Sequence, residues 1–299
     1  MRPPQQLLTR IRDAVDRAVD NLKNHIVQER ELGNIGDRAY PPERDLTSKL
    51  GGFIEIELAE VPAINGWSVC FHASVLADSG AKLTPETIVG ADIFFEVTIT
   101  GDEGGLVKKY GLIQAKNDGG GTRPWVMCEQ GELSIKMGVT AAEDAASACR
   151  RMLNYTDNAY LIVYDSSELG VGNAHDVTGL AIPPKQAGTR RRDEFEVPAR
   201  NLSTIITAFA ECTEGDRDGR QREYVRGILR RDTQIWEIEV RKAEAAAGGQ
   251  IAVALDHADD GVHFFASPGF DLLDETSGNQ ETREEPQAPR RYFTRGESH

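Results

Sequence analysis

Two β-strand patterns joined by a glycine-rich turn constrain the fold of this chain more than any other feature of its sequence. In residues 92–100 one alternating set of side chains is wholly apolar, and the other set includes Asp92, Phe94, Glu96 and Thr98. A turn rich in glycine then leads to a second strand-like run over residues 110–116. Because side chains repeat every two residues along a strand, Gln114 and Lys116 share one face. The sequence therefore predicts a hairpin in which an acid at the start of one strand meets a Gln-x-Lys pair at the end of its neighbour.

Helices are expected before this hairpin. Apolar residues recur every three or four positions in residues 5–32, which predicts an amphipathic helix. A second helix is expected from Glu43, and an alternation that begins at Phe53 leaves a strand open as the alternative. The Gly51-Gly52 pair favours that alternative, since each glycine costs a helix about 1 kcal/mol. A clean alternation over residues 67–75 predicts a further strand.

The rest of the chain predicts an α/β protein. Thr140 and Glu143 form a capping-box pattern that opens a helix, and the apolar run 159–164 is typical of a strand buried on both faces. A helix is expected over residues 202–212, and strands over residues 234–240 and 251–255. We therefore expect a central mixed β-sheet flanked by helices, because a helix followed by a buried strand implies a crossover.

The composition is that of a soluble globular protein, with 39% hydrophobic and 27% charged residues in a chain of 299. No apolar run approaches the roughly 20 residues of a membrane helix, and the first residues lack the apolar core of a secretory signal. The four cysteines contain no Cys-x-x-Cys pair, so neither a zinc site nor a disulfide framework is expected. These features predict a cytoplasmic protein with reduced thiols and no membrane association.

The formal net charge is −14, from 34 basic and 48 acidic residues, which argues against nucleic-acid binding driven by overall charge. Local basic patches are still present. They are Arg190, Arg191 and Arg192, and a second group of Arg217, Arg220, Arg222, Arg226, Arg230 and Arg231. Each patch has two interpretations, a contact surface for phosphates or a solvated face.

Two further segments also have two interpretations each. The glycine-rich loop at residues 117–124 lacks the Gly-Lys-Ser/Thr ending of a phosphate-binding loop. It is either a flexible connection or a segment beside the substrate. His257, Asp259, Asp260 and His263 are either metal ligands or part of a solvated loop.

The order of these elements over residues 40–165 resembles the PD-(D/E)XK nuclease superfamily. The Gly-Ala-Asp and Gln-x-Lys motifs are closest to the branch seen in Mrr-type restriction endonucleases and in nuclease domains of bacterial antiphage systems. The resemblance implies a restriction-endonuclease-like fold, with Asp92 as the acid of the first motif. Gln114 stands where most members have Asp or Glu, and Lys116 is the motif lysine. The acid of the upstream helix would be Glu43, and Gln130 is the candidate polar residue of the following helix.

The same resemblance implies a function. Asp92, Glu43, Gln114 and the carbonyl of Ala115 would hold Mg²⁺ or Mn²⁺, and Lys116 would orient the attacking water during hydrolysis of DNA. Arg190, Arg191, Arg192 and Gln130 would contact the DNA. A role in restriction or antiphage defence and a partner protein of such a system are also implied. We further expect the α/β protein to be a homo-oligomer.

A catalytically inactive fold that serves as a binding or assembly module is the alternative, which the net charge and Gln114 favour. The expected organisation is an N-terminal helical segment over residues 1–40 and a nuclease-like domain with a C-terminal elaboration over residues 41–270. A disordered tail is expected over residues 271–299, where few residues are apolar.

Overall fold

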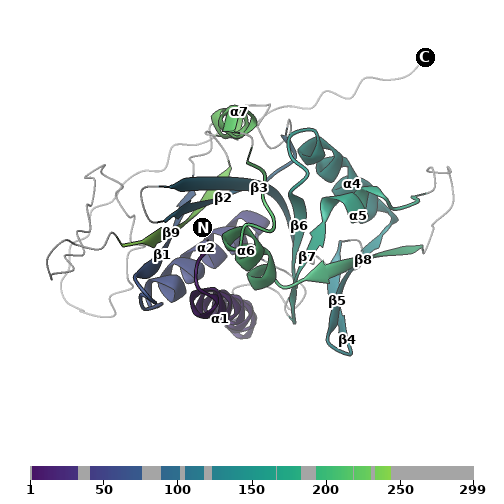
Figure 1. The fold of residues 1–299 in the computed structure, drawn as a ribbon. Coiled ribbons are helices and arrows are strands. Elements are labelled where there is room, and N and C mark those ends of the chain that lie inside the picture. The colour runs from purple at the N-terminus through teal and green to yellow at the C-terminus, as the bar shows by residue number, and fades with distance from the viewer. Residues whose placement is uncertain are drawn as a thin grey trace, which may run out of the picture. The chain divides into compact units, whose positions relative to one another are not determined.

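The computed structural model is built on one large mixed β-sheet (Figure 1). It describes residues 2–32, 41–75, 89–101, 105–117, 123–165, 167–182, 193–217, 219–229 and 233–243. Within these residues the strands are β1 (Trp67–Val75), β2 (Ile93–Thr100), β3 (Leu106–Asn117), β4 (Trp125–Glu129), β5 (Glu132–Gly138), β6 (Ala159–Tyr164), β7 (Leu169–Asn173), β8 (Glu194–Arg200) and β9 (Gln234–Lys242). They form a nine-stranded sheet in the order β1-β9-β2-β3-β6-β7-β8-β5-β4.

Helices cover both faces of the sheet, which confirms the expected α/β class (Figure 1). The helices are α1 (Gln5–Glu31), α2 (Glu43–Ala59), α4 (Val139–Leu153), α5 (Ala174–Thr178), α6 (Leu202–Ala210) and α7 (Gly219–Leu229). One apolar core joins α1, α2 and α6 to one face of the sheet, and a second joins α4, α5 and α7 to the other. The helix α1 of the expected N-terminal segment thus packs within the same core as α2.

The alternation in β2 divides its side chains between these two cores. Ile93 and Phe95 face α1, α2 and α6, whereas Phe94 faces α4. The hairpin of β2 and β3 is antiparallel as predicted, and Ile93 pairs with Ile113. On their outer sides β2 pairs in parallel with β9, and β3 pairs in parallel with β6. The strand β6 is buried along its whole length, as its apolar run predicts.

Helix α2 continues through Gly51 and Gly52, so the strand considered from Phe53 is wrong. The reason is a close approach of the helix to the sheet. A Cβ atom on Gly51 would lie 2.9 Å from Ala73 Cβ and 3.2 Å from Trp236 Nε1. Only glycine lets the helix lie this close to β1 and β9, and burial of the apolar face of α2 offsets the cost of two glycines.

Two other details differ from the predictions. Helix α4 begins at Val139, and its N-cap is Gly138, so Thr140 lies inside the helix and does not cap it. The hairpin β4–β5, the strands β7 and β8 and the helices α5 and α7 have no counterpart among the predicted elements. The strand expected at residues 251–255 and the tail at residues 271–299 lie outside the described residues.

Of the helices that the structure describes, none combines the length and apolarity needed to cross a bilayer.

Candidate functional site

The start of β2 and the end of β3 bring Asp92 and Gln114 into contact. The main-chain N–H of Asp92 donates to the carbonyl of Ile113 at 2.9 Å, which fixes the acid beside β3. Its Oδ2 atom accepts hydrogen bonds from Nε2 of Gln114 and, at 2.6 Å, from the main-chain N–H of Ala115. The two strands therefore place the carboxylate and the amide side by side.

The side chain of Gln114 is buried, at 2% exposure. Its Nε2 atom also donates to the carbonyl of Ala115 at 3.1 Å. The amide nitrogen therefore lies between two oxygens, one from Asp92 and one from Ala115, that the motif resemblance assigns to a metal ion. An N–H donor at this position neutralises part of the negative potential of the carboxylate, as a cation would.

Lys116 reaches a different acid. Its Nζ atom lies 3.2 Å from Oε2 of Glu43, and the two side chains are 28% and 30% exposed. Glu43 occupies the first turn of α2, where the partial positive charge of the helix N-terminus favours a carboxylate. That turn is attached to the end of β3, because Nδ2 of the buried Asn117 donates to the carbonyl of Pro41 at 2.9 Å.

Tyr164 on β6 is a buried phenol attached to helix α2. It is fully buried, and its hydroxyl donates to Oγ1 of Thr47 at 3.0 Å. Burial raises the pKa of Tyr164 well above its ordinary value; the hydrogen bond with Thr47 opposes this rise, and the negative charges of Asp92 and Glu43 add to it. Gln114, which contacts Asp92, lines one pocket with Lys116 and Glu43, so the structure brings the four residues of the two motifs and the upstream helix into one region.

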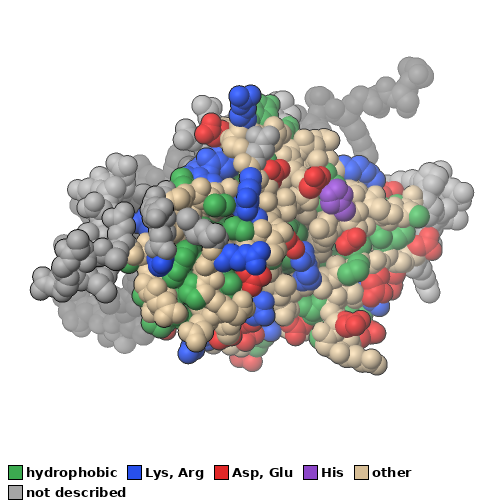
Figure 2. All heavy atoms as spheres, viewed as in Figure 1, with side chains coloured by type: hydrophobic (Ala, Val, Ile, Leu, Met, Phe, Trp, Pro, Cys, Tyr) green, Lys and Arg blue, Asp and Glu red, His purple; other side chains and the backbone are tan. Residues whose placement is uncertain are grey.

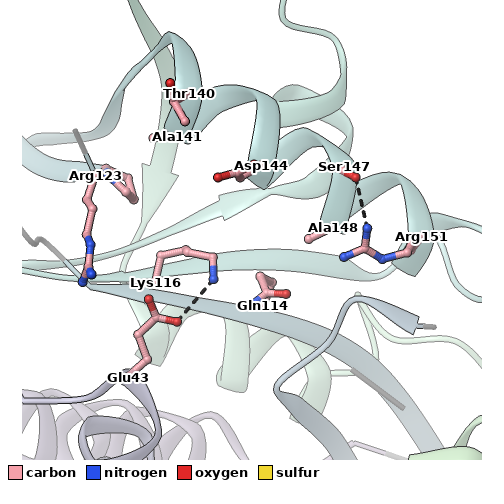
Figure 3. Close-up of a pocket in the computed structure, with 11 residues that line it drawn as sticks. Glu43, Gln114, Lys116, Arg123, Thr140, Ala141, Asp144, Ser147, Ala148 and Arg151 are labelled. Atoms are coloured by element: carbon pink, nitrogen blue, oxygen red, sulfur yellow. Dashed lines mark hydrogen bonds and ion pairs between the residues drawn. The ribbon is translucent and has the colours of Figure 1, made fainter. Parts of the chain in front are cut away.

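A pocket of about 540 Å³ opens beside these residues (Figure 3). Glu43, Gln114 and Lys116 line one side of it, and α4 forms the opposite wall with Thr140, Ala141, Asp144, Ser147, Ala148 and Arg151. Arg123 and Arg151 lie on opposite sides of the Lys116–Glu43 pair in this view. The pocket thus holds three cationic and two anionic side chains.

Gln130 is not part of this group. It lies in the two-residue turn of the β4–β5 hairpin, with a φ of 53° followed by 86° at Gly131, and it is exposed. Successive positive φ values are those of a hairpin turn, so the expected location of Gln130 on the following helix is wrong. The first helix after β3 is α4.

Sequence reasoning missed the pocket residues Arg123, Asp144 and Arg151. The signal for two of them is present in the sequence. Thr140, Asp144, Ser147 and Arg151 recur at three- and four-residue spacing, which places them on one polar face of a helix. This face is open to the pocket, and the buried alanines of α4 pack against the sheet.

Two arginines of the second basic group, Arg222 and Arg226 on α7, pair with carboxylates of the sheet. Arg222 and Arg226 lie 3.2 Å and 3.6 Å from the carboxylate of Glu96, whose side chain is only 4% exposed. Arg226 also pairs with Glu237 on β9. These two arginines balance a buried carboxylate and attach α7 to the sheet, since a buried charge is costly without a partner.

The other proposed contact or ligand residues cannot be placed. Arg190, Arg191 and Arg192, together with Arg230 and Arg231, lie outside the described residues. The same holds for His257, Asp259, Asp260 and His263.

A metal ion would find oxygen donors of the expected kind at the β2–β3 end. Among the described residues, no group of three or more His, Cys, Asp or Glu side chains is placed to hold a metal. The set at this site has a different composition, because it joins the carboxylates of Asp92 and Glu43 to the amide of Gln114 and the carbonyl of Ala115. Mg²⁺ accepts such oxygen ligands, so the donors fit in kind. Binding requires the amide of Gln114 to turn its oxygen toward the ion.

Comparisons of the whole chain with models of protein families, with curated proteins and with solved structures found no match. The geometry of the site and the motifs within it are therefore the basis for assigning a function.

Proposed function

We propose that this protein is a metal-dependent nuclease that hydrolyses phosphodiester bonds in DNA. One observation carries the proposal: Gln114, which contacts Asp92, lines a pocket together with the Lys116–Glu43 pair and two arginines. Carboxylate and amide oxygens are ligands for a hard cation, and lysine and arginine complement a phosphate. The pocket is therefore suited to a phosphodiester.

The side chains have distinct roles in this reaction. Asp92, Glu43, Gln114 and the carbonyl of Ala115 would hold Mg²⁺ or Mn²⁺, which when bound polarises the phosphate and lowers the pKa of a water. Lys116 donates hydrogen bonds to the phosphoryl oxygens and to the attacking water. Its ammonium group stabilises the negative charge that develops on the phosphorus oxygens.

The biological setting follows from the motif resemblance. We propose restriction or antiphage defence, with a partner protein and a homo-oligomeric assembly as parts of that setting. We also propose a cytoplasmic location, which fits the four cysteines, since none of them forms a disulfide.

A catalytically inactive binding or assembly module is the second candidate, and a specific observation favours it. The amide nitrogen of Gln114 occupies the space between the two oxygens assigned to the metal, and Lys116 is already paired with Glu43. A site in which each anion already has a protein donor has less need of a cation.

Cleavage of labelled DNA by the purified full chain decides between these candidates. With Mg²⁺ or Mn²⁺ present, we expect the wild-type protein to cleave and EDTA to stop the reaction. Asp92→Asn and Lys116→Ala should each lower the rate by about 10²–10³, the usual loss for one electrostatic group that acts on the transition state. Asparagine at position 92 keeps an acceptor for the N–H of Ala115, so the loss reports on charge.

Lys136→Ala is the matched control. Lys136 is also a partly buried lysine on the sheet, and it pairs with Glu196 at 3.7 Å, but it does not line the pocket. This variant should cleave like the wild type. Equal rates for the wild type, Asp92→Asn and Lys116→Ala would exclude this site as the origin of the activity. DNA binding without cleavage under any metal would favour the inactive module.

A further inference from the structure

We propose that the pocket between β3 and α4 binds an unpaired polynucleotide strand, whose phosphates contact Arg123 at one end and Arg151 at the other. This inference extends the proposed function, because it names the form of the substrate and the residues that hold it. It rests on the wall that α4 contributes, which the motifs of the β2–β3 hairpin do not include.

Arg151 lines the pocket with a guanidinium that is held in place by its own helix. Its Nη1 atom donates to Oγ of Ser147 at 3.0 Å, which orients the guanidinium along α4. Its Nε atom is buried and donates no hydrogen bond within the described residues. Arg151 lines the pocket, so a phosphate there can contact the accessible part of this guanidinium.

Arg123 is held at the other end of the pocket. Its Nη1 atom donates to Oδ1 of Asn117 at 2.5 Å, and Asn117 is itself buried and bonded to the carbonyl of Pro41. The guanidinium is therefore fixed by the end of β3 and the start of α2. Preorganisation of this kind lowers the entropy cost of binding an anion.

The N-terminus of α4 adds positive potential close to Arg123. Its N-cap is Gly138, which has no side chain to accept from the first N–H groups, and its first turn contains no acidic residue. Thr140 and Ala141 of this turn line the pocket. Unpaired N–H groups and the helix dipole together favour an anion at this end.

The two ends are too far apart to bind one phosphate. Thr140 and Arg151 are separated by eleven residues of α4, or about 16 Å along the helix axis. Neighbouring phosphates of a stacked strand are about 3.4 Å apart along its axis. A strand that crosses the pocket therefore contacts the two arginines through different phosphates and passes Lys116 between them (Figure 3).

Charge favours an unpaired strand over a duplex. A duplex needs a broad basic surface, whereas this chain carries a net charge of −14. On the face shown in Figure 2, Lys and Arg side chains lie interspersed with Asp and Glu side chains. Asp144 lies on the pocket wall between the two ends, where it repels any phosphate beside it. Among the described residues, the pocket gathers three cationic side chains against two acids, in a space narrower than the surface a duplex would cover.

Fluorescence anisotropy with the full chain in EDTA tests this proposal without any cleavage. The probes are labelled single-stranded DNA, single-stranded RNA of the same sequence and the corresponding DNA duplex, each over a series of salt concentrations. We expect single strands to bind more tightly than the duplex. Arg123→Ala and Arg151→Ala should each weaken binding about tenfold, and each should reduce the salt slope by about 0.7, the value for one phosphate contact on a single strand.

Two further variants complete the test. Asp144→Asn should strengthen binding about twofold, as loss of a like charge some 8 Å from a phosphate implies in water. Arg17→Ala is the control, since Arg17 is a half-exposed arginine on α1, across the sheet, where it pairs with Glu57 at 2.6 Å. It should leave affinity and slope unchanged. The thermal midpoint of each variant reports whether the fold is intact.

The outcomes are separable from those of the nuclease assay. Unchanged affinity and slope in the Arg123→Ala/Arg151→Ala double variant would overturn the strand contacts, even if the protein cleaves DNA. So would a duplex that binds as tightly as a single strand, or no binding of any probe. Weakened binding in a protein that never cleaves would support the contacts and leave only the chemistry wrong. Comparison of the DNA and RNA arms then identifies the preferred sugar.

Discussion

Gly90, two residues before Asp92, lies where helix α4 touches the sheet, so Gly90→Ala tests that contact directly. Its φ is +82°, and a Cβ atom built on it would lie 2.5 Å from the carbonyl oxygen of Ala148. A left-handed backbone costs an alanine about 1–2 kcal/mol. A forced contact in a packed interior costs about 1–3 kcal/mol more, and the less flexible unfolded chain returns about 0.4–1 kcal/mol. We expect a net loss of about 2–4 kcal/mol in the free energy of unfolding.

The matched control is Gly131→Ala in the β4–β5 turn. Gly131 has a similar φ of +86°, but nothing lies within 4 Å of the position of its Cβ atom. This variant therefore carries the backbone strain without the contact, and it should cost only about 1 kcal/mol. The difference between the two variants isolates the contact between Gly90 and α4.

Urea denaturation followed by circular dichroism measures both variants. With a slope of about 3 kcal/mol per molar urea, Gly90→Ala should lower the midpoint by about 1 M and Gly131→Ala by about 0.3 M. Because α4 carries Asp144 and Arg151, displacement of this helix should also weaken the binding of single-stranded DNA in Gly90→Ala, but not in Gly131→Ala. A Gly90→Ala protein as stable as Gly131→Ala would refute the seating of α4 on this glycine.

Three other predictions concern single side chains. Gln114→Glu places a second carboxylate against Asp92, so the thermal midpoint in EDTA should fall by about 5–10 °C and Mg²⁺ should restore it; a midpoint that ignores Mg²⁺ would argue against a cation site. Burial raises the pKa of the Cys149 thiol to about 12, so maleimide at pH 8, read by mass spectrometry, should label the exposed Cys128 and leave Cys149 unmodified. Burial, reinforced by the charge of Lys49, lowers the pKa of His25 below 6.5. Between pH 6.5 and this lowered pKa, the unfolded chain binds more protons than the folded chain. The free energy of unfolding therefore declines as the pH falls through this range. His25→Gln should flatten this decline in urea titrations across pH, and an unaltered profile would exclude His25 as its cause.

The sequence by itself determined the elements whose patterns are long and regular. Helix α1 follows from its three- and four-residue spacing, and β6 follows from its uninterrupted apolar run. The alternation in the β2–β3 hairpin determined that Gln114 and Lys116 share a face, since a strand repeats every two residues whatever lies around it. The contact between Asp92 and Gln114 also needs the register of the hairpin, which pairs Ile93 with Ile113.

Short elements and turns were not predictable in this way. The strand β7 has five residues, two of them glycine, and contains barely two periods of an alternation. The helix α7 carries three arginines and few apolar residues in its sequence, and it is attached to the sheet largely through a buried carboxylate on β2. Gln130 stands in a two-residue turn with Gly131, and its expected place on a helix came from the motif resemblance and not from a local pattern.

Only the tertiary structure decided how distant segments meet at the site. Glu43 reaches Lys116 across 73 residues of sequence, because Asn117 ties the start of α2 to the end of β3. The polar face of α4 is visible in the spacing of its residues. Its position opposite Lys116, however, depends on the β3-to-β6 crossover and on Gly90, which lets α4 lie close to the sheet. Local patterns fix which face a side chain occupies. The packing of the whole chain fixes what lies across from it, because that choice depends on the summed burial of segments far apart in the sequence.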